Sequence, residues 1–169
     1  MGLTLRQFCE SNDRTDLLEE WDFDENRPFT PDNVMSTSNR NMQWRCRKHG
    51  HEWTASVANR VKGTTCPYCA NRKVLAGFND LATVEPDLAQ EWHPTLNGAL
   101  RPTDVTRGCS KKVWWKCKTC GHEWQAIVYS RACKSKNGCP MCAGRVNMAQ
   151  RKYRENILAW ANEQKDVQQ

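Results

Sequence analysis

Cysteine and histidine residues occur along this chain in closely spaced pairs, and such pairs can support either redox or metal chemistry. Cys66 and Cys69 form a CPYC motif, which on its own is typical of a reactive thiol pair and equally of half a zinc site. A second pair, Cys46 and His49, lies upstream at the distance expected for the other half of a four-ligand site. A redox pair needs no upstream partner and usually lies in a βαβ pattern, of which the sequence shows no sign. The spacing therefore favours zinc.

An internal repeat supports zinc, because the same pairs recur when the chain is shifted by 71 residues. The segment WRCRKHGHEWTASVANR, residues 44–60, aligns with WKCKTCGHEWQAIVYSR, residues 115–131. After an insertion of two residues in the second copy, CPYCAN aligns with CPMCAG, residues 139–144. The second copy therefore has four cysteines at zinc-ligand spacing, which are Cys117, Cys120, Cys139 and Cys142.

The first copy offers two histidines as its fourth ligand, His49 and His51. His51 aligns with His122, but the second copy already has four cysteines without His122. We therefore predict that His49 binds the metal in the place of Cys120, and that His51 and His122 share a structural role such as a hydrogen bond. The predicted ligands of two structural Zn²⁺ ions are Cys46, His49, Cys66, Cys69, Cys117, Cys120, Cys139 and Cys142. The cysteines without a counterpart are predicted to be free thiols, with Cys133 as a spare ligand; they are Cys9, Cys109 and Cys133.

The fold class expected from these patterns is a small, metal-stabilised α+β protein. Hydrophobic residues make up 38% of the sequence and the mean hydropathy is −0.83, so each core must be small. Zinc contributes roughly 10–16 kcal/mol per site to the folding of small zinc peptides. We predict two modules, residues 1–75 and 76–145, each with a short helix and a zinc-knuckle β-hairpin whose outgoing strand covers 51–60 or 122–131. Residues 146–169 are predicted to form a C-terminal amphipathic helix with its tail.

The order of the tryptophan, proline, GHEW and ligand positions resembles the tandem "probable zinc-ribbon domain" family, whose knuckles are of the zinc-ribbon or treble-clef kind. The resemblance covers residues 17–72 and 88–145. It implies two structural zinc modules without catalytic groups, and a role near nucleic acid, since family members sometimes lie beside endonuclease-like domains. The chain departs from the family pattern at His49, where the family commonly has cysteine, and it carries no nuclease domain.

Tryptophan is abundant, with 8 residues, and six of these occur in matched pairs at equal positions of the two copies. We expect the matched pairs to form the small core of each module. Trp114 differs, because it aligns with Gln43 and alternation places it on the face opposite Trp115. An outward tryptophan among lysines is a candidate for nucleic-acid contact, and the alternative is that the predicted C-terminal helix covers it.

Charge is strongly segregated along the chain, although the net charge is only +6. Acidic segments (1–39 and 76–100) alternate with basic segments that contain the zinc ligands (40–75 and 101–145). Clustered basic residues beside aromatic ones are typical of phosphate binding, so we predict backbone-dominated binding of nucleic acid, with DNA favoured over RNA. The first candidates are Arg60 and Arg131, which align with each other; the further candidates are Arg45, Arg47, Lys48, Lys62, Lys111, Lys112, Trp114, Lys116 and Lys118.

A second class of function stays open, namely a zinc-stabilised adaptor or inhibitor that acts on a nuclease or another nucleic-acid-processing protein. The acidic segment 10–25 would then contact a basic partner. An enzyme is not expected, because the sequence shows no catalytic triad, phosphate loop or open metal site. We expect no small-molecule substrate and no membrane span. The cysteines are spaced as metal ligands rather than as disulfide partners, which favours the reducing cytoplasm.

Overall fold

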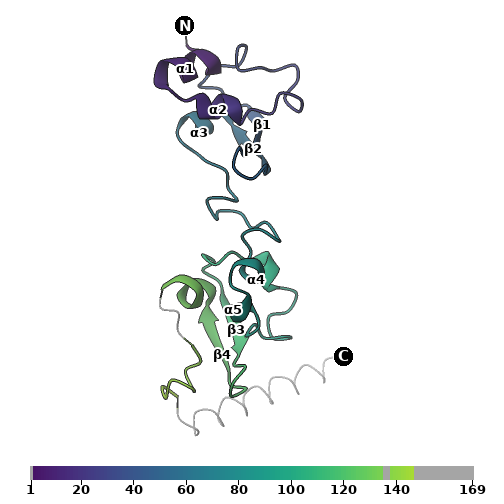
Figure 1. Cartoon of the computed structure of the whole chain (residues 1–169), viewed down its shortest axis with the longest axis vertical. Helices are drawn as coiled ribbons and strands as arrows, with labels where there is room; N and C mark the ends of the chain where they lie inside the picture. Colours follow the sequence, from purple (N-terminus) through teal and green to yellow (C-terminus); the bar gives the residue numbers. More distant parts are fainter. Residues whose placement is uncertain (1, 135–137, 147–169) are drawn as a thin grey trace. The chain divides into compact units, whose positions relative to one another are not determined.

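The computed structural model describes residues 2–134 and 138–146, and it divides into two compact units between Lys73 and Val74 (Figure 1). We call the first unit module 1 and the second module 2. The C-terminal helix predicted from residue 146 onward lies almost wholly outside the described residues. None of the helices in the described part of the chain is long and apolar enough to cross a membrane.

Module 1 contains a two-stranded antiparallel hairpin and three short helices. In chain order its elements are α1 (Leu5–Asn12), α2 (Thr15–Glu19), β1 (Asn41–Arg45), β2 (Glu52–Ser56) and α3 (Val57–Val61). The helix α1 was not expected from the sequence. It begins with a reciprocal cap, in which the Thr4 hydroxyl accepts from the Gln7 backbone N–H at 3.3 Å and the Gln7 side chain accepts from the Thr4 N–H at 3.0 Å.

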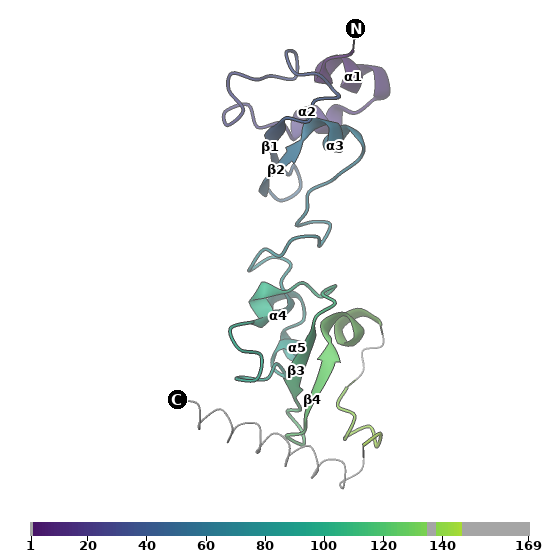
Figure 2. The same cartoon turned by 180° about the vertical axis from the view of Figure 1, so that it is seen from behind.

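Module 2 repeats the helix–hairpin order in its own unit. Its elements are α4 (Leu81–Val84), α5 (Pro86–Ala89), the 3₁₀ turn η1 (Pro102–Asp104), β3 (Lys112–Lys116), β4 (Glu123–Ile127) and the π-helical turn η2 (Ser130–Lys134). The helix α5 lies beside β3 in both views (Figures 1 and 2). Two hydrogen bonds hold the chain after α5 against β3, from the Lys116 N–H to the Glu91 carbonyl at 2.7 Å and from the His93 N–H to the Trp114 carbonyl at 3.1 Å.

Each hairpin buries one face and leaves the other in contact with solvent, as its alternating residues require. In module 1 Trp44 pairs across the strands with Trp53, and in module 2 Trp115 pairs with Trp124. All four side chains are buried. Trp21 and Trp92 pack edge-on against Trp44 and Trp115, with ring centroids 5.3 Å apart in both modules. The matched tryptophans therefore form the two cores.

The outgoing strands are shorter than predicted. In module 1 the strand ends at Ser56, whose hydroxyl accepts from the Asn59 N–H at 3.3 Å and thereby caps α3. Val57 is consequently a helical core residue rather than a strand residue. The apolar alternation of Trp53, Ala55 and Val57 runs one residue past the end of the strand and concealed this change, because strict alternation is a strand pattern.

Candidate metal centres and basic surface

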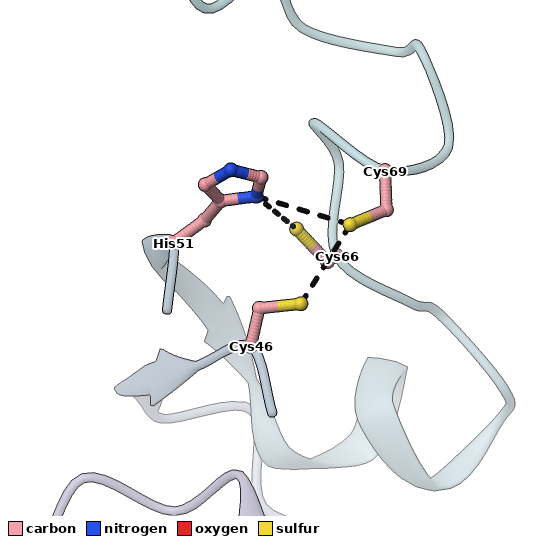
Figure 3. A group of neighbouring side chains, drawn as sticks. All are labelled: Cys46, His51, Cys66 and Cys69. Carbon is pink, nitrogen blue, oxygen red and sulfur yellow. Dashed lines mark hydrogen bonds between the residues drawn. The ribbon is translucent and has the colours of Figure 1, made fainter. Parts of the chain in front are cut away.

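The first ligand cluster gathers four side chains from three separate segments of module 1 (Figure 3). Cys46 follows β1, His51 directly precedes β2, and Cys66 and Cys69 lie in the loop after α3. The Cys46 and Cys69 sulfurs are 3.6 Å apart, and His51 Nδ1 is 3.7 Å from the Cys66 sulfur and 3.8 Å from the Cys69 sulfur. All four donor atoms lie within 4.8 Å of one another.

The second cluster has the same construction in module 2 and contains four cysteines. The Cys117 sulfur lies 3.7 Å from the Cys142 sulfur, and the Cys120 sulfur lies 3.6 Å from the Cys139 sulfur. A tetrahedral zinc ion with Zn–S bonds of about 2.3 Å holds its sulfurs roughly 3.8 Å apart. The donor types, their number and their separations therefore fit zinc in both modules. With four protein ligands at each metal, these are structural zinc sites.

A tight turn at each first pair aims backbone N–H groups at one sulfur. In module 2 the Gly121 N–H bonds to the Cys117 carbonyl at 2.9 Å, and Gly121 has a φ of +68°, a conformation that favours glycine. Burial alone would raise the pKa of Cys117, but hydrogen bonds from the N–H groups of Cys120 and Thr119 and from the Cys120 and Cys142 thiols together lower that pKa to about 7. The turn therefore stabilises the thiolate that zinc requires.

In each cluster at least one thiol has a raised pKa and needs a nearby cation before it can ionise. Burial and the neighbouring thiols raise the pKa of Cys69 to about 12, and hydrogen bonds with the Cys120 and Cys117 thiols raise the pKa of Cys142 to about 12. Several thiolates cannot share a space of this size without a compensating positive charge. A divalent ion at the centre supplies that charge, which is a further reason for assigning zinc.

The structure corrects the predicted ligand set at one position, because the cluster contains His51 instead of His49. His49 is exposed, and its Nδ1 approaches the Cys69 sulfur at 3.4 Å while its ring stacks on His51 at 5.4 Å. Between them, Gly50 reverses the chain with a φ of +70°, so His51 leaves the turn on the side of the thiols. Alignment with the second copy misled the choice, since it cannot show that His51 Nδ1 lies near the sulfurs of both Cys66 and Cys69.

The histidine of the repeated GHEW motif consequently has two different roles. In module 2 His122 is buried and stacks on Trp124, with ring centroids 5.9 Å apart and planes 5° from parallel. The predicted shared role of His51 and His122 is therefore also corrected. The unmatched cysteines lie outside both clusters, and the predicted spare ligand Cys133 instead accepts a hydrogen bond from Arg107 Nε at 3.3 Å.

The two histidines of module 1 can be separated by metal affinity. We expect His51→Ala to weaken zinc binding by module 1 more than roughly 100-fold, because loss of a direct ligand exceeds the 10–100-fold cost of losing a supporting group. We expect His49→Ala to cost roughly tenfold or less, since His49 lies outside the cluster and only supports the ligands Cys69 and His51. Competition with a chromophoric chelator measures both affinities. A larger loss in His49→Ala would restore the original ligand prediction.

Arg60 and Arg131, predicted as the first phosphate contacts, are core residues. Their exposed fractions are only 1% and 6%. Arg60 pairs with Glu20 and lies over the rings of Trp44 and Trp53 at 4.8 and 5.3 Å. Arg131 pairs with Glu91 in the same way, over the equivalent two tryptophans at 4.4 and 4.9 Å. The repeated arginine thus stabilises each module as a buried ion pair with cation–π contacts, and the prediction of nucleic-acid contact is wrong for both.

The remaining basic candidates all lie at the surface, but they differ in their partners. In module 1, Arg45 pairs with Asp22 and Glu52 at 2.9 and 3.1 Å, and Arg47 pairs with Glu19 at 2.7 Å. In module 2, Lys116 pairs with Glu123 at 3.1 Å. Among the described residues the other candidate lysines are exposed and form no ion pair; they are Lys48, Lys62, Lys111, Lys112 and Lys118. Trp114 is half-buried between the module 2 lysines.

The comparison with protein families agrees with this geometry. The family model described as "Probable Treble clef zinc finger domain" matches the chain twice, at residues 17–72 and 88–145. Each match contains one complete ligand cluster. No curated protein matches the chain significantly. With two matches that together cover more than half of its length and two four-ligand zinc sites at the expected places, this chain is a tandem member of the treble-clef zinc finger family.

Proposed function

We propose that this chain is a non-catalytic zinc protein that binds nucleic acid, mainly through phosphate contacts from the basic hairpin of module 2. The observation that supports the proposal is the set of unpaired lysines on that hairpin. Residues 101–145 contain ten basic and two acidic residues, and Lys111, Lys112 and Lys118 are exposed without an ion pair among the described residues. Such a positive surface attracts the phosphate backbone whatever its base sequence.

The construction of the metal sites supports a non-catalytic role. In each module four protein ligands surround the metal, so water or substrate has no coordination position. Thiolate-bound zinc persists in a reducing compartment, which supports the cytoplasm as the site of action. We favour DNA over RNA as the ligand, as the resemblance to modules found beside endonuclease-like domains suggests.

One observation favours the alternative role of an adaptor or inhibitor for a nucleic-acid-processing protein. Phe23 on module 1 is 51% exposed and lies between the buried Asp22 and the exposed Asp24 and Glu25. An exposed aromatic side chain among carboxylates is suited to a basic protein surface rather than to a phosphate backbone. Dependence of partner binding on Phe23 would support the adaptor role.

The repeat provides a matched test of phosphate contact by module 2. The substitutions Lys111→Gln and Lys118→Gln remove two exposed lysines, whereas Arg40→Gln and Arg47→Gln change the aligned positions of module 1. Arg40 lies over the Phe29 ring at 4.1 Å and Arg47 pairs with Glu19, so their charges are already engaged. We expect the lysine variant to bind a short duplex roughly tenfold more weakly at low salt.

The salt dependence of binding identifies the cause of such a loss. Loss of two phosphate contacts should reduce the slope of log K against log salt by about two, measured between roughly 50 and 200 mM. The arginine variant should keep both the affinity and the slope. Equal losses in the two variants would place the binding surface outside the module 2 hairpin, and the absence of binding by the zinc-loaded wild-type chain would overturn the proposed function.

A further inference from the structure

The solvent-facing side of the module 2 hairpin carries different residue types from that of module 1, whereas the buried sides of the two hairpins carry the same tryptophans. On the buried side Trp44 and Trp53 recur as Trp115 and Trp124. On the outward side Gln43 and Ser56 are replaced by Trp114 and Ile127, and Ala58 is replaced by Tyr129 just beyond the strand. Ser56 and Ala58 are buried in module 1, whereas Ile127 and Tyr129 are exposed in module 2, so the substitutions put larger apolar side chains at the surface.

The strand register places Trp114 and Ile127 on one surface, and Tyr129 follows Ile127 by two residues, in the helical turn that ends the strand. Lys112 pairs with Ile127, Trp114 with Gln125 and Lys116 with Glu123, and these six residues alternate with the buried ones. Ile127 is 39% exposed and Tyr129 is 43% exposed. In module 1 the equivalent central pair is polar, with the Thr54 hydroxyl donating to Gln43 Oε1 at 3.0 Å. We call the surface formed by Trp114, Ile127 and Tyr129 the aromatic platform.

Positive charge flanks the aromatic platform along β3. Lys112 and Lys116 occupy the same outward face of β3, and Lys111 directly precedes that strand. Glu123 neutralises Lys116, whereas Lys111 and Lys112 have no ion pair among the described residues. Apolar rings flanked by ammonium groups complement a ligand that has both flat apolar faces and negative charge.

We propose that the aromatic platform binds single-stranded nucleic acid by stacking unpaired bases on Trp114 and Tyr129 while Lys111 and Lys112 contact phosphates. The inference rests on the proposed function and specifies its ligand. In a duplex the base faces are stacked on one another and are not available, so aromatic side chains of this kind contribute to binding only for unpaired bases. Lysines alone would bind duplex and single strand with little distinction.

The charge on the platform argues against a protein as its ligand. An acidic protein could pair with Lys111 and Lys112, but the cores of protein interfaces are depleted in lysine. The nearest carboxylate on the outward face, Glu123, is already paired with Lys116 and with His93 at 3.1 Å. The face therefore presents net positive charge beside its rings, as single-strand binding grooves do.

The test uses the full zinc-loaded chain and a fluorescein-labelled thymidine 12-mer, with a mixed-sequence duplex of the same length as comparison. The substitutions Trp114→Gln and Tyr129→Ala give the platform the residues of module 1. We expect each variant to bind the single strand roughly five- to a hundredfold more weakly, the range for one stacked base, and to bind the duplex unchanged. Trp114→Phe should retain most of the affinity, because its ring can still stack.

The results of these binding measurements distinguish base stacking on the aromatic platform from the proposed binding of nucleic acid in general. Single-strand binding that is unchanged in both variants, or lost equally for single strand and duplex, would overturn the stacking role while leaving phosphate binding intact. Wild-type protein that binds neither probe would overturn the proposed function itself. Zinc content and the near-ultraviolet circular dichroism of each variant show whether it is folded, and a uridine 12-mer compares RNA with DNA. The reverse substitution Gln43→Trp in module 1 is the matched control and should add little, since Arg45 beside it is paired with acids.

Discussion

Removal of zinc by an excess of a strong chelator is expected to unfold both modules. Each module has a core of a few tryptophan and aliphatic side chains, and the metal joins segments that are otherwise linked by loops. Zinc contributes roughly 10–16 kcal/mol per site in comparable small peptides, which exceeds the total stability of most small domains. Near-ultraviolet circular dichroism of the buried tryptophans should collapse on chelation and return when zinc is added back.

Single-site variants should show that the two modules depend on different ions. Because the chain forms two units that divide after Lys73, Cys66→Ser should remove one zinc and unfold module 1, and Cys139→Ser should do the same to module 2. Zinc analysis should then give about one ion per chain in each variant. A chelated chain that keeps its native dichroism, or a variant that retains two ions, would contradict the structural role of zinc.

Lowering the pH should release zinc and destabilise both modules, as chelation does. Zinc holds its thiolates ionised, so their pKa in the loaded state lies below that of the thiols in the unfolded chain, where cysteine titrates near 8.5. Stability from such a depressed pKa is fully present above the unfolded value and is lost as the pH falls through the pKa of the loaded state.

Substitution of the buried arginine in either module is expected to reduce stability more than any other change considered except the removal of zinc. Arg131→Met should destabilise module 2 by about 3–5 kcal/mol, because it leaves the Glu91 carboxylate without its partner in a site where that side chain is only 14% exposed. The double variant Arg131→Met with Glu91→Met should recover much of the loss, since no charge is then left unpaired. Urea unfolding of the zinc-loaded chain measures each free energy.

The surface pair Arg47 and Glu19 provides the matched control. Both side chains are 53% exposed, so Arg47→Gln should change the free energy of unfolding by less than about 1 kcal/mol. A comparably small change in Arg131→Met would show that the arginine contributes little to the core. Duplex binding that falls in Arg131→Met while the protein remains folded and zinc-loaded would instead support the contact originally predicted for Arg131.

The chemistry and repetition of the zinc sites could be predicted from the sequence because they depend on spacing along the chain. CxxC and CxxH pairs at matched distances in two copies need no tertiary information, and seven of the eight predicted ligands lie in the two clusters. The short helix and the β-hairpin of each module were likewise predicted from local patterns. Local propensity and periodicity suffice for such elements.

Tertiary structure decided the features in which two positions compete or one pattern has two explanations. His49 and His51 are equally capable ligands by type, and only the course of the chain through the left-handed turn at Gly50 places His51 within the four-donor cluster. Arg60 and Arg131 recur at one place in both copies, a pattern compatible with a binding surface and with a core. Burial against two tryptophans and a glutamate settled that question, because a long side chain can fold inward when a carboxylate and aromatic rings replace its water.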